Sequence, residues 1–136
     1  MRSIGVRQID HVTFVVKDLD TSRRFYEDAL GMQPAPRPNF PFRGLWFSAG
    51  ATYIHLIHEH DQSGPAGATI DPSAAVSRTR HVAFEVEDAA RTIEVLKEHG
   101  IAIVSGPKNR PDGPIQIYVL DPDNNCIELF SMKSTL

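Results

Sequence analysis

IDHVTFVVKD, at residues 9–18, returns as TRHVAFEVED at residues 79–88, with His, Val, Phe, Val and Asp in the same places. Side chains alternate between the two faces of a β-strand, so the apolar residues of the first copy share one face and His11 lies on the other. The second copy repeats this alternation, with His81 on its polar face. The repeat therefore predicts two similar modules, each opening with a strand whose one face is core and whose other face carries a histidine.

A helix is expected after each of these strands. Residues 20–30 and 88–99 have apolar side chains at helical spacing, and each stretch begins near an aspartate and ends before a glycine, Gly31 or Gly100. Aspartate favours a helix start because its side chain accepts a hydrogen bond from a free backbone N–H, and glycine favours a helix end because it tolerates the left-handed conformation. After each helix we expect a strand, a turn-rich loop and a hairpin, so each module is βαβββ.

The hairpin strands are marked by short apolar runs between turn residues. They are expected at residues 45–48 and 53–57 in the first module and at residues 115–120 and 126–130 in the second. Loops rich in Pro, Gly and Asn are expected at residues 33–41 and 105–114, the second after a strand at residues 101–104. The sequence predicts one α+β domain at residues 1–136, with module 1 at about 6–58, a linker at 59–78 and module 2 at about 79–132.

The composition excludes several classes of function. There are 14 Lys and Arg against 17 Asp and Glu, a net charge of −3, and no run of like charge, so nucleic acid is not an expected partner. No apolar stretch approaches the roughly 20 residues of a membrane-spanning helix, and the first residues lack the apolar core of a signal peptide. We expect a cytoplasmic protein. Cys126 is the only cysteine, so any metal must be held by histidines and carboxylates.

Four polar residues stand at equivalent places in the two modules. His11 and His81 lie in the first strands of the two modules. His55 and Glu128 lie in the last strands, each between an isoleucine and a leucine (IHL and IEL). Their apolar neighbours face the opposite way, so all four share one face if the sheets pack as one unit. Three imidazoles and a carboxylate suit Zn, Fe, Ni, Mn or Co as divalent ions. Each residue singly is more typical of an ordinary strand position, and only the joint pattern indicates a metal site.

The pattern resembles the vicinal oxygen chelate (VOC) superfamily, the glyoxalase/bleomycin resistance protein/extradiol dioxygenase family, in its glyoxalase-like branch. Besides residues 9–18, the resemblance is carried by RFYEDALGM at 24–32, YIHL at 53–56, RHVAF at 80–84 and YVLDPDNNCIEL at 118–129. It implies that the two modules form an open curved sheet around a metal site held by His11, His81 and Glu128. His55 occupies the fourth ligand position, where lactoylglutathione lyases have a carboxylate, so its role as a ligand stays open. Asn124 replaces the family's usual glycine, which asparagine can do in the left-handed region.

The resemblance also implies an activity and an assembly. One divalent ion with three imidazoles and one carboxylate keeps a net charge of about +1, which favours an anionic, bidentate oxygen ligand. We expect a metal-dependent glyoxalase-type lyase or isomerase that acts through a metal-chelated, enediolate-like intermediate on a small oxygenated substrate, with Glu128 as the catalytic residue that moves the proton. The alternatives are an Fe(II) extradiol-type dioxygenase and a fosfomycin- or bleomycin-resistance-type modifying or binding protein. A homodimer is expected, with its site inside one chain or shared between two.

Four further residues are candidates for binding the substrate. Thr13 shares a strand face with His11, and Cys126 shares the alternation of Glu128. Trp46 and Tyr53 lie on the strands of the first hairpin. Aromatic strand residues and a small thiol are also typical of an ordinary core, so a purely structural role is the alternative for each.

Overall fold

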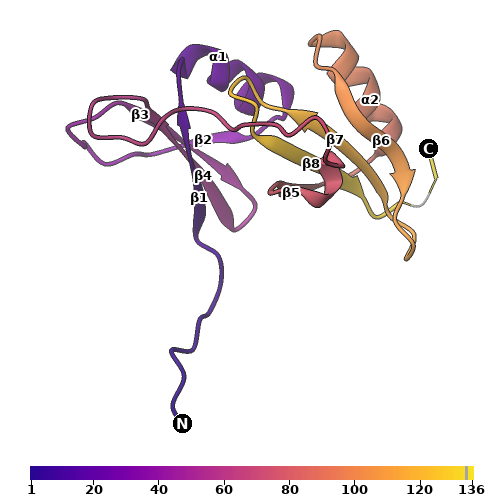
Figure 1. Ribbon diagram of the computed structural model, residues 1–136, viewed down its shortest axis with the longest axis horizontal. Coiled ribbons are helices and arrows are strands. Elements are labelled where there is room, and N and C mark those ends of the chain that lie inside the picture. The colour runs from indigo at the N-terminus through magenta and orange to yellow at the C-terminus, as the bar shows by residue number, and fades with distance from the viewer. Residues whose placement is uncertain (134) are drawn as a thin grey trace.

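The computed structural model of the chain describes residues 1–133 and 135–136, and its strands form two four-stranded sheets (Figure 1). The first module consists of β1 (His11–Val16), α1 (Leu19–Arg23), the π-helical segment η1 (Arg24–Ala29), β2 (Gln33–Ala35), β3 (Gly44–Ala49) and β4 (Thr52–His58). The 3-10 turn η2 (Val76–Arg78) precedes the second module, which consists of β5 (Val82–Val86), α2 (Ala89–Glu98), β6 (Ile103–Asn109), β7 (Ile115–Leu120) and β8 (Cys126–Ser131). The predicted α+β fold of two tandem βαβββ modules is confirmed.

The two sheets have the same topology. Their strand orders are β1-β4-β3-β2 and β5-β8-β7-β6. In each sheet the first and last strands of the module pair in parallel, and the remaining pairs are antiparallel. The parallel pairs put Thr13 opposite His55 and Ala83 opposite Glu128. The candidate ligands of each module therefore lie on two neighbouring strands.

Both helices begin as the sequence predicts. Asp18 and Asp88 each accept a hydrogen bond from the backbone N–H three residues further on, at 2.9 and 3.0 Å, which caps the first turn. The helix expected at residues 20–30 is α1 followed directly by η1. Its last turn widens, because the backbone N–H of Leu30 bonds to the carbonyl of Phe25 at 2.9 Å.

Two of the expected loops contain strands. The stretch at residues 33–41 begins with β2, and β6 runs well into the stretch at residues 105–114. Both strands lie at the edge of their sheet, where Pro is tolerated because one side of the strand needs no hydrogen bond. β6 also contains register shifts against β7, the irregularity that lets a strand accommodate Gly106 and Pro107.

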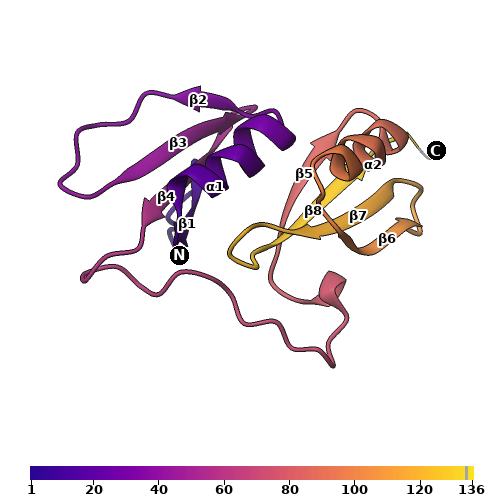
Figure 2. The same cartoon turned by 90° about the horizontal axis from the view of Figure 1, so that it is seen from above.

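The modules meet through the helical side of the first sheet. α1 lies between this sheet and the second module (Figure 2). Tyr26, from η1, is buried and stacks near Phe14 and Phe47, and its hydroxyl donates a 2.6 Å hydrogen bond to Asp121 in the turn between β7 and β8. Burial, reinforced by the Asp121 carboxylate, raises the pKa of Tyr26 well above its usual value, so this residue stays a neutral donor.

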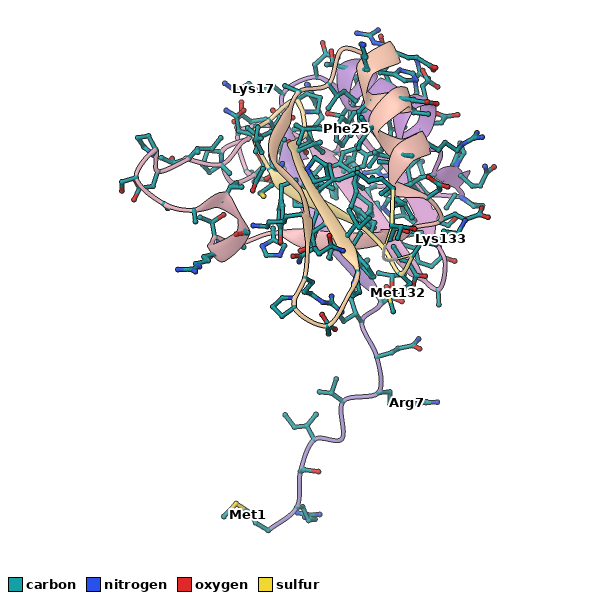
Figure 3. The ribbon with its side chains drawn as sticks, turned by 90° about the vertical axis from the view of Figure 1, so that its right-hand side faces the viewer. Met1, Arg7, Lys17, Phe25, Met132 and Lys133 are labelled. Carbon is teal, nitrogen blue, oxygen red and sulfur yellow. The ribbon has the colours of Figure 1, made fainter. Side chains whose placement is uncertain are left out.

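Residues 1–10 form an extended arm that leaves the start of β1 and projects away from both modules (Figure 3). All ten residues are exposed. In the part of the chain that the structure describes, no helix has the length and apolar character needed to cross a membrane.

Candidate metal centre

The first pair of candidate ligands lies on the face of the first sheet opposite α1. The rings of His11 and His55 stack with centroids 3.9 Å apart, and Trp46 stacks on His55 at the same centroid distance with an interplanar angle of 1°. His55 is therefore held between the other two rings. Nδ1 of His11 lies 2.8 Å from a carboxylate oxygen of Asp10. When Nδ1 donates this bond, Nε2 carries the lone pair that a metal requires.

The environment of His55 favours a neutral imidazole. Burial lowers the pKa of His55, and the adjacent His11 ring lowers it further because two imidazolium charges would repel each other. The neutral ring is the form that binds a metal. The stack thus keeps the His55 ring neutral, with one ring nitrogen that has a free lone pair for a metal.

The second pair lies on the second sheet, where Glu128 is 5% exposed. Its Oε1 accepts a 2.7 Å hydrogen bond from the Tyr118 hydroxyl and lies 3.2 Å from Nε2 of His81. The side-chain amide of Gln116 donates to Oε2 at 3.3 Å. Nδ1 of His81 lies 2.8 Å from the carbonyl of Thr79, which can only accept, so this nitrogen is the protonated one. The other ring nitrogen of His81, Nε2, faces the carboxylate of Glu128.

Alternation along the strands does not point to Tyr118 or Gln116. Burial raises the pKa of Tyr118, and its hydrogen bond to Glu128 raises it further, so the hydroxyl is a permanent donor to the carboxylate. The signal that could have found Tyr118 is the pairing of β7 with β8, in which it stands directly opposite Glu128. That register is fixed only when the length of the connecting turn is known.

The chain does not bring the two pairs together. His11 and His55 lie on the face of the first sheet that points away from α1 and η1, and the contact of Tyr26 with Asp121 is made on the opposite, helical face. No group of three or more His, Cys, Asp or Glu side chains within residues 1–133 and 135–136 is placed to hold one metal ion. The four predicted ligands suit a divalent ion by their chemistry. Within one chain, however, they form two separate pairs, His11 with His55 and His81 with Glu128.

The first pair is bordered by three of the predicted substrate-binding residues. Trp46 stacks on His55, and Tyr53, 37% exposed, lies 6.4 Å from the same ring in a tilted arrangement. Thr13 is exposed and pairs with His55 in the sheet register. These three side chains surround a surface of this face that solvent can reach.

Cys126, the fourth predicted substrate-binding residue, is buried beneath the linker. Its sulfur lies 3.9 Å from the carbonyl of Val76 in η2. Burial raises the pKa of the thiol, and the nearby Glu128 carboxylate raises it further. In this environment Cys126 is a neutral thiol.

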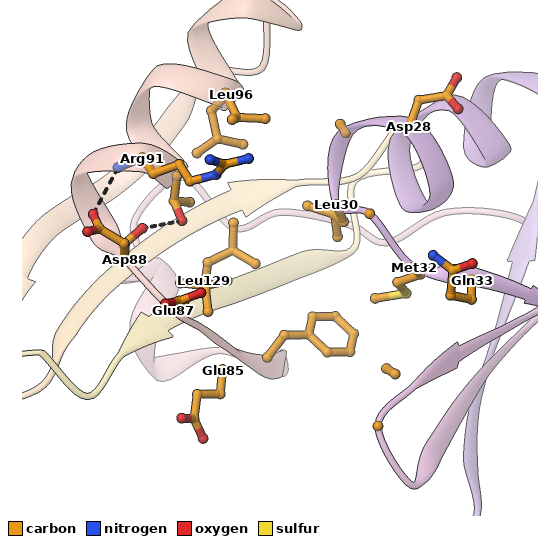
Figure 4. Close-up of a pocket in the computed structure, with 18 of the residues that line it drawn as sticks. Asp28, Leu30, Met32, Gln33, Glu85, Glu87, Asp88, Arg91, Leu96 and Leu129 are labelled. Atoms are coloured by element: carbon orange, nitrogen blue, oxygen red, sulfur yellow. Dashed lines mark hydrogen bonds between the residues drawn. The ribbon is translucent and has the colours of Figure 1, made fainter.

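The part of the chain that the structure describes contains cavities beside these pairs. One, of about 830 Å³, lies between the modules and is lined by the end of η1 and by β5 and α2 (Figure 4). None of the four predicted ligands lines it. A second, of about 760 Å³, lies between β1 and the linker and includes His81 and Cys126 in its wall, but neither His11 nor His55. Neither cavity joins the two pairs.

The chain thus combines two tandem βαβββ modules with polar residues at equivalent strand positions. The chain belongs to the Glyoxalase/Bleomycin resistance protein/Dioxygenase superfamily, whose family model matches residues 8–129. This membership confirms the resemblance to the vicinal oxygen chelate superfamily.

Similar proteins support the same assignment. The chain is 33% identical to the glyoxalase domain-containing protein RDO1 of Mycosarcoma maydis, over 97% of this chain and 72% of the relative. It is 29% identical to a lactoylglutathione lyase of Haemophilus influenzae, over 94% and 95%. A crystal structure of a glyoxalase family protein from Bacillus anthracis superposes with a TM-score of 0.74 at 29% identity, covering 96% of this chain and 98% of that one.

Proposed function

We propose that this protein is a metal-dependent glyoxalase-type enzyme, a lyase or isomerase, whose metal site forms between two copies of the chain. The observation that carries the proposal is the division of the donors into two pairs, His11 with His55 and His81 with Glu128. The first pair faces away from the second module of its own chain, so a second copy is needed to complete a set of four. The similarity to a lactoylglutathione lyase supports the class of activity.

Glu128 is the residue to which we assign proton transfer. A divalent ion held by the four donors would act as a Lewis acid toward the oxygen atoms of a small substrate. A carboxylate at this position can take a proton from the substrate and return it. Tyr118 and Gln116 each donate to a different oxygen of Glu128, so the carboxylate is held in one orientation. Thr13, Trp46 and Tyr53 supply the adjoining surface for the substrate. Cys126 is a neutral thiol in the wall of the cavity that Thr13 and His81 also line.

The first test is metal content per chain by elemental mass spectrometry, on protein without a histidine tag. The parent is expected to hold about one divalent ion per chain, and both His11→Ala and Glu128→Ala are expected to lose it. Retention of the ion by either variant would contradict the proposed ligand set. Iron together with oxygen uptake would replace the lyase proposal with the dioxygenase alternative. A parent that stays empty after reconstitution would leave a metal-free binding role.

A mixing experiment tests whether the site is shared. Each variant alone lacks one ligand in every site. A mixed dimer of His11→Ala and Glu128→Ala has one site with all four ligands and one site that lacks both His11 and Glu128. Random exchange of equal amounts should restore about one quarter of the parent metal content and turnover. If each site lies within one chain, mixing restores nothing.

A further inference from the structure

The arm at residues 1–10 carries apolar side chains that nothing in the described chain covers. Ile4, Val6 and Ile9 are 96%, 86% and 69% exposed. Two arginines, Arg2 and Arg7, stand among them. An extended apolar segment that leaves its own domain is typical of a strand that pairs with another chain.

β5 offers an edge for such a strand. Within the described residues it pairs with β8 on one side only, and its other side is the edge of the sheet. An open strand edge presents free backbone donors and acceptors in a row. Ala83 and Glu85 are exposed on this strand. Figure 4 shows Glu85 on this strand and Glu87 just after it, so the strand carries acidic side chains where the arm carries Arg2 and Arg7.

The two-copy site fixes how the arm and this edge would meet. β1 and β5 are equivalent edge strands, with His11 at the start of one and His81 immediately before the other. A twofold relation between equivalent edges makes the strands antiparallel and places His11 beside His81 of the second copy. Each step back from His11 is then a step forward from His81. Arg7 comes opposite Glu85, and Ile9 comes opposite Ala83.

We propose that residues 4–9 of one copy add as a strand to the open β5 edge of a second copy, with Arg7 paired to Glu85. This inference rests on the proposed two-copy site and adds to it the segment that holds the copies together. The pairing covers apolar side chains of the arm and satisfies the free backbone groups of β5. It also places the arm immediately beside the metal ligands of both chains.

Disulfide trapping tests the register. Directly opposed residues in an antiparallel pair are close enough for a disulfide, so Ile9→Cys combined with Ala83→Cys should give a covalent dimer on mild oxidation. Ile9→Cys combined with Val104→Cys is the matched control, because Val104 is exposed on β6 at the opposite edge of the same sheet. Native Cys126 is buried and does not compete. Equal trapping of the two pairs, or none with Ala83, overturns the inference.

Charge exchange tests the same contact without a covalent bond. Arg7→Glu should raise the dimer dissociation constant by up to about fivefold per arm, and adding Glu85→Arg should restore it. Sedimentation of the parent, the single variant and the double variant measures this. A parent that is monomeric, or a double variant no tighter than the single one, overturns the inference. If trapping succeeds but mixing of His11→Ala with Glu128→Ala restores no metal site, the arm contact stands and the proposed function is wrong. If mixing restores the metal site but trapping fails, only the arm contact is wrong.

Discussion

The hydroxyl of Tyr118 donates a 2.7 Å hydrogen bond to Oε1 of Glu128, and the two residues stand directly opposite each other on β7 and β8. A second tyrosine makes a similar contact far from the candidate ligands, where Tyr26 donates to Asp121 at 2.6 Å. One fold thus contains two buried tyrosine–carboxylate bonds with different expected consequences. Only the first orients a predicted ligand.

Tyr118→Phe and Tyr26→Phe are therefore a matched pair. Each should lower the free energy of unfolding by about 1.5–3 kcal/mol, because each removes a hydrogen bond to a buried carboxylate. Urea unfolding measures this loss. Only Tyr118→Phe should also weaken metal binding, by about 10- to 100-fold, as expected for a group that orients a ligand. Equal effects of both variants on metal affinity would show that Tyr118 acts through stability alone.

The stability of the chain should depend on His55 at mildly acidic pH. Since the pKa of His55 is lowered in the folded state, the unfolded chain binds a proton more readily than the folded one. The contribution of His55 is fully present above its unfolded pKa of about 6.5 and is lost as the pH falls toward the lower folded value. Urea midpoints of metal-free protein between pH 8 and pH 5 should fall less steeply for His55→Gln than for the parent. If the urea midpoint of His55→Gln falls as steeply as that of the parent, a group other than His55 causes the pH dependence.

Replacement of Trp46 should separate ring stacking from simple burial. Trp46→Phe keeps a ring against His55, whereas Trp46→Leu keeps apolar volume without a ring. The stacked pair should contribute about 0.5–1.5 kcal/mol beyond the area that it buries, so the leucine variant should be the less stable one. Thermal unfolding of both variants checks the order. If the two are equally stable, His55 is held by His11 and the strand alone.

Much of the candidate site follows from local pattern. Alternation along the strands predicts which face each candidate ligand lies on, and the structure places His11 beside His55 and His81 beside Glu128. The positive φ of Asn124, +67°, is also as expected for a turn position usually filled by glycine.

The relation between the modules does not follow from local pattern. It depends on the packing of α1 and η1 toward the second module, through contacts such as that of Tyr26 in η1 with Asp121, which leave no periodic signal in the sequence. The strand β2 and the part of β6 beyond residue 104 were expected to be loop for another reason. Their Pro and Gly are typical of loops, and only the sheet edge makes them acceptable in a strand.

The edge position of β6 leads to a last prediction, at Gly106. Its φ is +87°, and a Cβ built there would collide with the backbone carbonyl oxygen of Gln116 on β7. Gly50, in the turn between β3 and β4, also has a positive φ, +61°, but a Cβ there meets no atom within 4 Å. Gly50→Ala should lose about 1–2 kcal/mol of unfolding free energy through backbone strain alone. Gly106→Ala bears the same strain plus a contact that neither strand can relieve without breaking the ladder, so its loss in urea unfolding should exceed that of Gly50→Ala. If the two variants lose equal unfolding free energy, β6 can move away from β7 at little cost, which would contradict the predicted clash.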